Sequence, residues 1–276
     1  MQDLFRVVVL GIVQGLTEFL PISSSGHLIV ARELFGWEFS NDLTVDVALH
    51  LGTTLAVLAF FWREWAQMLG SGARWVAGRG RVANTNVVFG HRMLFLLFVG
   101  SLPAAAVGAA FDSYIEENVR SPLVVGAMLI VFAAVLYAAE RLSDGERRIG
   151  SSGWADAVWV GCAQAVSLVP GVSRAGVTIS AALSRGYRRE DAARFSFLLA
   201  TPVIIGAGGL KILEAVADGI PREDIGLLLA GAAVAAITGW MAIGYLLRLV
   251  RTTSFLPFVV YRVVVGVFVL VYFGLF

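Results

Sequence analysis

Six long apolar segments constrain the fold of this chain more than any other feature. They are the stretches 43–62, 87–111, 121–139, 195–217, 225–247 and 255–276. A helix needs ~20 apolar residues to cross a hydrocarbon layer about 30 Å thick, and each segment is close to that length or longer. Since backbone polar groups in a bilayer must bond within the segment, six transmembrane helices are predicted. Hydrophobic residues make up 58% of the chain and charged residues 15%, which excludes an ordinary water-soluble domain.

Two other apolar regions, 4–36 and 154–186, are each interrupted in the middle by proline, glycine and serine. The two halves of each region are too short to cross a bilayer comfortably, so each region is predicted to form a re-entrant helical hairpin. The predicted fold class is therefore an all-α integral membrane protein, with six transmembrane helices and two re-entrant hairpins in a single polytopic domain over 1–276.

Arginines in the loops predict the orientation, because basic residues in short loops favour the cytoplasmic side. The segment 63–92 contains five arginines and one acidic residue, Glu64. When this segment is placed in the cytoplasm, the other basic loops fall on the same side, whereas 112–120 and 218–224 fall outside. Hairpin 154–186 then enters the membrane from the cytoplasm, and hairpin 4–36 enters from the opposite side.

The two interrupted regions align with each other at an offset of 150 positions. Identical or similar residues recur in the pairs Gly11 and Gly161, Gln14 and Gln164, Thr17 and Ser167, Ser23 and Ser173, Gly26 and Gly176, and Gly36 and Gly186. The chain is therefore interpreted as two repeats, 1–140 and 154–276, each with one hairpin and three spans. An odd number of crossings inverts the second repeat, which predicts that the tips 21–27 and 170–176 meet near the bilayer midplane.

The residues at these tips suit the binding of a phosphate. Serines and glycines at 21–27 can expose backbone N–H groups at the start of a half-helix, whose dipole favours an anion. Arg174 adds a forked donor that matches phosphate oxygens. Glu18 and Arg174 would each cost about 2.5 kcal/mol or more if unpaired in hydrocarbon, which favours a functional role. With His27 and the serine hydroxyls, the tips contain the groups that phosphoryl transfer requires.

Simpler structural roles remain open for these residues. Serines in apolar helices often cap a helix end or bond to a nearby carbonyl, and a single buried histidine is commonly a core residue. Glu18 and Arg174 could form a buried ion pair that only holds the hairpins together. No specific role is predicted for the other polar residues at depth, which are Asp46, His50, Tyr261 and Arg262.

The stretches QGLTEFLPISSSGH (14–27) and PGVSRAGVTIS (170–180) resemble the two signature regions of the undecaprenyl-pyrophosphate phosphatase family, membrane enzymes of the bacitracin-resistance type. The likeness extends along the chain, including FSFLLATP (195–202) and SFLPFVVYR (254–262). The resemblance implies hydrolysis of the C55 isoprenyl pyrophosphate to the monophosphate carrier used in cell-wall synthesis. It also implies a divalent cation, Mg²⁺ or Ca²⁺, and a location in the inner (plasma) membrane with a site open to the extracytoplasmic side.

Carried onto this sequence, the resemblance assigns catalytic roles to Glu18, Ser24, His27 and Arg174, with Glu18 also the metal ligand. The expected phosphate- and substrate-binding residues are Gln14, Ser23, Ser25, Gly26, Ser173, Gly176 and Thr178. Two positions depart from the family pattern, because Gln14 stands where the family often has glutamate and Ala175 where it commonly has serine. The expected mechanism has Ser24 attack the terminal phosphorus while His27 activates or orients it. A competing assignment makes His27 the nucleophile.

The expected partners are the polyprenyl pyrophosphate substrate and membrane lipids, and the sequence leaves open whether the chain forms a homodimer. A net charge of +1 predicts no nucleic-acid partner. The main alternative is a secondary transporter or lipid-carrier flippase, because inverted repeats with broken helices also typify transport. An acid-phosphatase-like lipid phosphatase is disfavoured, since no histidine follows Arg174 in 175–184. A non-catalytic scaffold would not explain the buried charges.

Overall fold

The computed structural model describes residues 2–39, 42–78, 88–219 and 221–275, which form eleven α-helices and no β-strand. In chain order the helices are α1 (Gln2–Phe19), α2 (Ser24–Phe35), α3 (Asp42–Phe60), α4 (Trp62–Val76), α5 (His91–Asn118), α6 (Pro122–Leu142), α7 (Trp154–Val166), α8 (Arg174–Ser184), α9 (Arg189–Asp218), α10 (Arg222–Leu249) and α11 (Leu256–Leu275). A short 3₁₀ helix, Ile149–Ser151, precedes α7. The all-α fold class is therefore confirmed.

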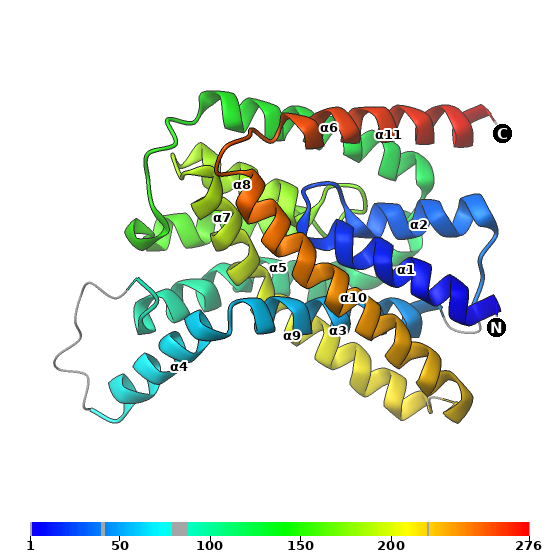
Figure 1. Ribbon diagram of the computed structural model, residues 1–276, viewed down its shortest axis with the longest axis horizontal. Helices are drawn as coiled ribbons and strands as arrows, with labels where there is room; N and C mark the ends of the chain where they lie inside the picture. Colours follow the sequence, from blue (N-terminus) through cyan, green and yellow to red (C-terminus); the bar gives the residue numbers. More distant parts are fainter. Residues whose placement is uncertain (1, 40–41, 79–87, 220, 276) are drawn as a thin grey trace.

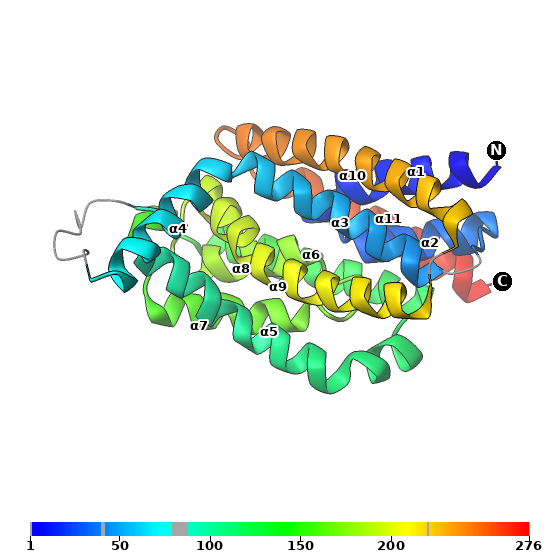
Figure 2. The same ribbon diagram turned by 90° about the horizontal axis from the view of Figure 1, so that it is seen from below.

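Five of the described helices, α5, α6, α9, α10 and α11, are long and apolar enough to cross a membrane. A sixth crossing is formed if α3 is counted together with α4, which follows it after one residue at an angle of 75°. The six predicted spans lie largely on α3, α5, α6, α9, α10 and α11, with ends that differ by up to several residues, and the protein is a multi-pass membrane protein. Figures 1 and 2 show both termini at one end of the bundle and α4 at the other.

The two interrupted regions fold as the helix pairs α1–α2 and α7–α8, with breaks that lie near the middle of the bundle in Figure 1. At the first break, Ser23 caps α2, and its Oγ accepts the Gly26 backbone N–H at 3.4 Å. At the second, Ser173 caps α8 in the same way, with the Gly176 N–H at 3.0 Å. Ser23 and Ser173 have φ angles of 77° and 72°, and they are the only described non-glycine residues with positive φ. Such a left-handed conformation is uncommon for serine.

Glycines allow the helices around the breaks to approach closely. A Cβ at Gly11 in α1 would lie 2.8 Å from the carbonyl oxygen of Gly231 in α10. A Cβ at Gly161 in α7 would collide with the carbonyl oxygen of Gly100 in α5. Small residues let helix backbones approach in membranes, where packing replaces the hydrophobic effect. The two hairpins are thus held by different long helices, α1 by α10 and α7 by α5.

The prediction that 63–92 is a loop was wrong for its first part, which forms α4. This helix packs against α5 through Met68 and Gly72, and Ser71 Oγ accepts the backbone N–H of His91 at 3.0 Å. The arginine content suggested a loop, but the four-residue spacing of Met68 and Gly72 buries one helical face.

The predicted outer loops are also shorter than expected. Most of 112–120 is the last part of α5, which continues to Asn118, and α10 already begins at Arg222. A helix can extend beyond the hydrocarbon layer because each added residue adds a hydrogen bond once the helix exists. Arg79 and Arg81, and the first residue of the predicted span 87–111, lie outside the described residues.

Candidate active site

Glu18, near the end of α1, is the centre of the polar cluster between the breaks. The residue is 8% exposed, and its carboxylate accepts two hydrogen bonds at Oε2, from Ser24 Oγ at 2.5 Å and from Gln14 Nε2 at 3.1 Å. On the other side, Arg174 Nη1 lies 3.3 Å from Oε1. Residues of both broken regions therefore meet at one carboxylate.

Ser24 is positioned by the first break itself. It is the first residue of α2, directly after the Ser23 cap, and it is partly exposed. The first amides of a helix have no partner within the helix and carry its positive partial charge. The Ser24 hydroxyl thus lies at a helix end suited to an anion, and its hydrogen already points to a base.

Arg174 has the corresponding position at the start of α8, and its side chain is one-quarter exposed. Its Nη1 is buried and forms no hydrogen bond with the described residues, so the contact with Glu18 is an ion pair without hydrogen-bond geometry. A buried N–H group without an acceptor costs free energy until a ligand oxygen supplies one. Arg174 is therefore able to bind an additional oxygen atom at this point.

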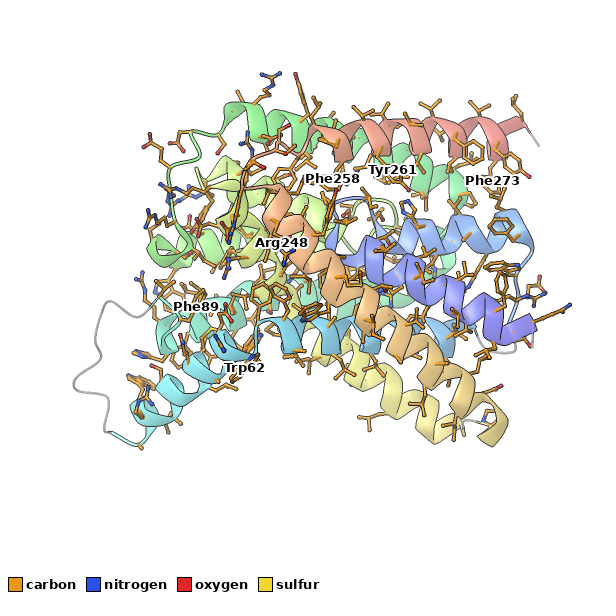
Figure 3. All side chains as sticks on the ribbon, in the orientation of Figure 1. Trp62, Phe89, Arg248, Phe258, Tyr261 and Phe273 are labelled. Atoms are coloured by element: carbon orange, nitrogen blue, oxygen red, sulfur yellow. The ribbon has the colours of Figure 1, made fainter. Side chains whose placement is uncertain are left out.

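His27 does not bond to Ser24 among the described residues. Its Nδ1 lies 2.7 Å from the carbonyl oxygen of Ser23, which can only accept, so Nδ1 carries the proton and donates. In the neutral ring Nε2 then accepts the Tyr261 hydroxyl at 2.8 Å, and the two rings stack at 5.6 Å. Figure 3 shows Tyr261 on α11, beside α2. Both nitrogens of His27 are thus engaged by partners other than Ser24.

Arg262 of α11, for which no role was predicted, joins the two breaks. It is fully buried and donates to the carbonyl oxygens of Pro21 at 3.1 Å, Gly171 at 3.0 Å and Val172 at 2.9 Å. Further bonds reach the carbonyls of Leu129 and Met128 in α6. The signal in the sequence was an arginine within an apolar span, which is costly unless backbone carbonyls or charges surround it.

The remaining predicted binding residues shape the site. A Cβ at Gly26 would lie 2.9 Å from Val125 Cγ1, and one at Gly176 would lie 2.7 Å from Arg262 Nη1. Ser25 is partly exposed next to Ser24. Ser23 and Ser173 cap the two half-helices.

Thr178, which was predicted to bind phosphate or substrate, is fully buried. Its hydroxyl bonds to the carbonyl oxygen of Arg174 at 2.7 Å and to Ser196 Oγ of α9 at 2.6 Å, within the core. This arrangement joins α8 to α9 behind the site.

His50 and Asp46 of α3, which had no predicted role, lie beside the site. His50 Nε2 is 3.9 Å from Glu18 Oε2, and its Nδ1 donates to the carbonyl oxygen of Asp46 at 2.8 Å. The Asp46 carboxylate binds Arg32 of α2 at 2.7 Å and Arg120 at 3.2 Å. Asp46 thus attaches the second half of the first hairpin to α3.

The donor set fits a divalent cation that shares its ligands with a substrate. The described residues contain no group of three or more His, Cys, Asp or Glu that could hold a metal ion. Gln14, however, is bonded to Glu18 through Nε2, and its buried Oε1 has no hydrogen-bond partner within the described part of the chain. Mg²⁺ is commonly bound through one or two carboxylates together with substrate phosphates. An orphaned amide oxygen beside one carboxylate is compatible with that arrangement.

Comparisons with known proteins cover nearly the whole chain. A family model described as "Bacitracin resistance protein BacA" matches residues 7–268. Similar proteins named undecaprenyl-diphosphatase include that of Alcanivorax borkumensis, 43% identical over 96% of this chain and 97% of the relative. Those of Thermomicrobium roseum and Desulforudis audaxviator are 44% and 41% identical, each over 97% of both chains.

Proposed function

The chain belongs to the bacitracin resistance protein BacA family, and we propose that it is an undecaprenyl-diphosphatase acting at the Glu18 cluster. It hydrolyses undecaprenyl pyrophosphate to undecaprenyl phosphate and inorganic phosphate, which recycles the lipid carrier for cell-wall synthesis and confers bacitracin resistance. The observation that carries the assignment of the site is the meeting of Ser24, Glu18 and Arg174 between the two hairpins. A transporter or flippase is not favoured, since the relatives are named as phosphatases.

In the proposed first step, Ser24 Oγ attacks the terminal phosphorus and its proton passes to Glu18. The new Oγ–P bond replaces the bridging P–O bond, and undecaprenyl phosphate leaves with the electron pair. Arg174 and the first amides of α2 bind the phosphoryl oxygens, whose charge must be stabilised in the transition state. After Glu18 has released its proton to solvent, a water attacks the phosphoserine. Glu18 takes the proton of that water and returns it to Ser24 as inorganic phosphate leaves.

Ser24 is a better nucleophile candidate than His27 in this geometry. The Ser24 hydroxyl bonds directly to a carboxylate base at 2.5 Å, whereas both nitrogens of His27 are engaged by Ser23 and Tyr261. A nucleophile within hydrogen-bond reach of its base is the usual arrangement in covalent catalysis. His27 accordingly serves to hold the α2 tip against α11, and Tyr261 joins it in this positioning role.

A divalent cation, Mg²⁺ or Ca²⁺, would supply charge neutralisation on the pyrophosphate oxygens when bound. The residues that would hold it are Glu18 and the orphaned Oε1 of Gln14.

The two halves of the chain are proposed to be inverted-topology repeats, 1–140 and 154–276. Support comes from the shared conformation of Ser23 and Ser173, each capping a half-helix three residues before a glycine. In the proposed repeats α1 corresponds to α7, and α5 corresponds to α10. Each first half-helix packs against the long helix of the other repeat, since α1 lies against α10 and α7 lies against α5. A two-fold relation between inverted halves would produce this exchange.

The proposed location is the inner membrane, with the α4 end of the bundle in the cytoplasm. Arg63 and Arg74 on α4, and Arg147 and Arg185 around α7 and α8, support this orientation because basic loops favour the cytoplasm. In this orientation the first hairpin enters from outside, and the site opens to the extracytoplasmic side.

The test is phosphate release from undecaprenyl pyrophosphate by purified protein, with and without a chelator. Wild type is expected to release phosphate, and Glu18→Gln and Arg174→Ala to lose about a thousandfold in rate, the usual size of a lost base or phosphate clamp. Activity that is indifferent to both substitutions would contradict the proposed site.

A further inference from the structure

Helix α4 has a surface that the phosphatase site does not use. Five residues on its outer side are exposed and recur at helical spacing, which places them in one apolar stripe of Trp62, Ala66, Leu69, Ala73 and Val76. An adjacent side of the helix, about 100° around its axis, faces the rest of the protein, because Met68 and Gly72 are buried there. An exposed apolar stripe of this kind marks contact with lipid or with another protein.

A second, polar stripe runs along α4 beside the apolar one. It consists of Arg63, Gln67 and Arg74, all exposed and also at helical spacing. The only acidic residue of the helix, Glu64, is bound by Arg194 of α9 at 3.3 Å. The positive charges of the polar stripe are therefore not neutralised from within α4.

The orientation of α4 relative to α3 also favours a position at the membrane surface. It turns by 75° from α3 at Trp62, and Figure 3 shows Trp62 at the start of this diverging helix. If α3 crosses the bilayer, a helix at that angle lies close to the membrane plane. Arg63 stacks over the Trp62 ring at 5.3 Å, and tryptophan prefers the headgroup region. Apolar and basic stripes side by side on one helix are typical of a helix lying in a membrane interface.

We infer that α4 lies in the cytoplasmic headgroup layer and binds anionic lipid phosphates through Arg63 and Arg74, with its Trp62–Val76 stripe in the acyl chains. Charge complementarity favours an anionic lipid over a zwitterionic one, since each arginine near such a surface contributes a several-fold preference. A second copy of the chain is disfavoured as the occupant, because an interface made by the apolar stripe would bring Arg63 and Arg74 near those of the partner. The inference depends on the proposed orientation and not on the phosphatase site.

A depth measurement tests the first half of the inference. Cys162 is the only cysteine, so Cys162→Ser permits single labels at Leu69→Cys or Gln67→Cys. In nanodiscs, a spin label at position 69 is expected to collide with lipid-soluble oxygen, and one at 67 with a water-soluble nickel chelate. Equal exposure of both labels to the chelate would overturn the membrane-interface position. Shielding of the label at 69 from both reagents would mean that protein covers the stripe, and would also overturn it.

A lipid-preference measurement tests the second half. A donor fluorophore attached at position 67 of the Gln67→Cys variant is expected to transfer about fivefold more energy to acyl-labelled phosphatidylglycerol than to phosphatidylcholine present at the same density, as the two arginines enrich the acidic lipid. Arg63→Gln with Arg74→Gln should abolish the excess, whereas the matched control Arg148→Gln, an exposed arginine outside α4, should retain it. The inference would be overturned if the protein that retains Arg63 and Arg74 transferred energy equally to the two lipids. It would also be overturned if the excess transfer to phosphatidylglycerol remained after both arginines were replaced. Phosphate release is measured in parallel and is expected to be unchanged in both variants.

Discussion

Glu18 of α1 and Arg174 of α8 face each other with Oε1 and Nη1 3.3 Å apart, although they belong to different hairpins. Each charge would be costly if it were buried alone, and their contact offsets part of both costs. Ser24 bonds to the same carboxylate. The Glu18–Arg174 pair therefore places the Ser24 hydroxyl beside a base and near an arginine that can donate hydrogen bonds to a phosphate. The ion pair is thus both a structural link between the hairpins and the centre of the proposed chemistry.

Removing the Ser24 hydroxyl should separate the two candidate nucleophiles. Ser24→Ala is expected to lower the rate of phosphate release by about a thousandfold or more, because covalent catalysis loses its attacking group. His27→Gln should cost about tenfold, through a less well held α2 tip. Ser151→Ala, at an exposed serine outside the site, is the control and should remain near wild type. A trapped phosphoenzyme should resist acid, as phosphoserine does, and an acid-labile phosphoenzyme would favour His27 instead.

Arg262 should be required for the shape of the site. Arg262→Met leaves at least three buried carbonyls without donors and is expected to destabilise the protein by about 3 kcal/mol or more in thermal unfolding. Arg262→Lys keeps the charge but not the fork, so it should fold and lose at least tenfold in activity. Arg251→Lys, at an exposed position, is the control. Wild-type activity in Arg262→Lys would show that the tips do not depend on this clamp.

Gln14→Glu should strengthen cation binding. A second carboxylate beside Glu18 replaces the orphaned Oε1 with a charged ligand, so the cation concentration for half-maximal activity is expected to fall about tenfold. Gln164→Glu, at the equivalent buried position of the second hairpin, is the control and should not change the cation dependence. An unchanged cation requirement in Gln14→Glu would argue against Gln14 as a ligand.

Two glycine substitutions with different surroundings should have opposite effects. Gly176→Ala would place a Cβ 2.7 Å from Arg262 Nη1 and is expected to lower both activity and the thermal midpoint. Gly206→Ala, inside α9 with no described atom within 4 Å of the added carbon, should raise stability by about 0.5–1 kcal/mol. Thermal unfolding in detergent measures both. A Gly176→Ala protein with unchanged midpoint and rate would show that the tip can adjust.

Asp156 should make stability depend on acid pH. Burial alone would raise the pKa of this carboxyl, but hydrogen bonds from Arg147, Arg185 and the Gly153 amide hold it well below its ordinary value. With the folded pKa below the unfolded one, the stabilisation is complete above about pH 5 and decreases as the pH falls through the unfolded pKa near 4 toward the folded one. The thermal midpoint should therefore drop between about pH 5 and 3, and Asp156→Asn should flatten that drop while lowering the midpoint at about pH 7.

Much of the fold could be predicted because long apolar segments have few solutions in a bilayer. The helices α6, α10 and α11 agree with the predicted spans within a few residues at each end. The breaks also lie where Pro21 and Pro170 interrupt apolar runs. By contrast, α4 was not predicted. Its short amphipathic pattern indicates a helix, but the many arginines of 63–92 indicated a loop. The local sequence does not show whether another helix is available to pack against the segment, and here the packing of α4 against α5 decided the outcome.

The sequence by itself determined that the chain spans a membrane, that two of its helical regions are broken, and that an acid, serines, a histidine and an arginine occur at the breaks. Only the tertiary structure decided how those groups are paired. His27 bonds to Tyr261 of α11 and not to Ser24, and Arg262 of the same helix joins both tips. The physical reason is that hydropathy depends on each segment alone, whereas a hydrogen bond depends on which distant segments pack together and on the direction of each side chain.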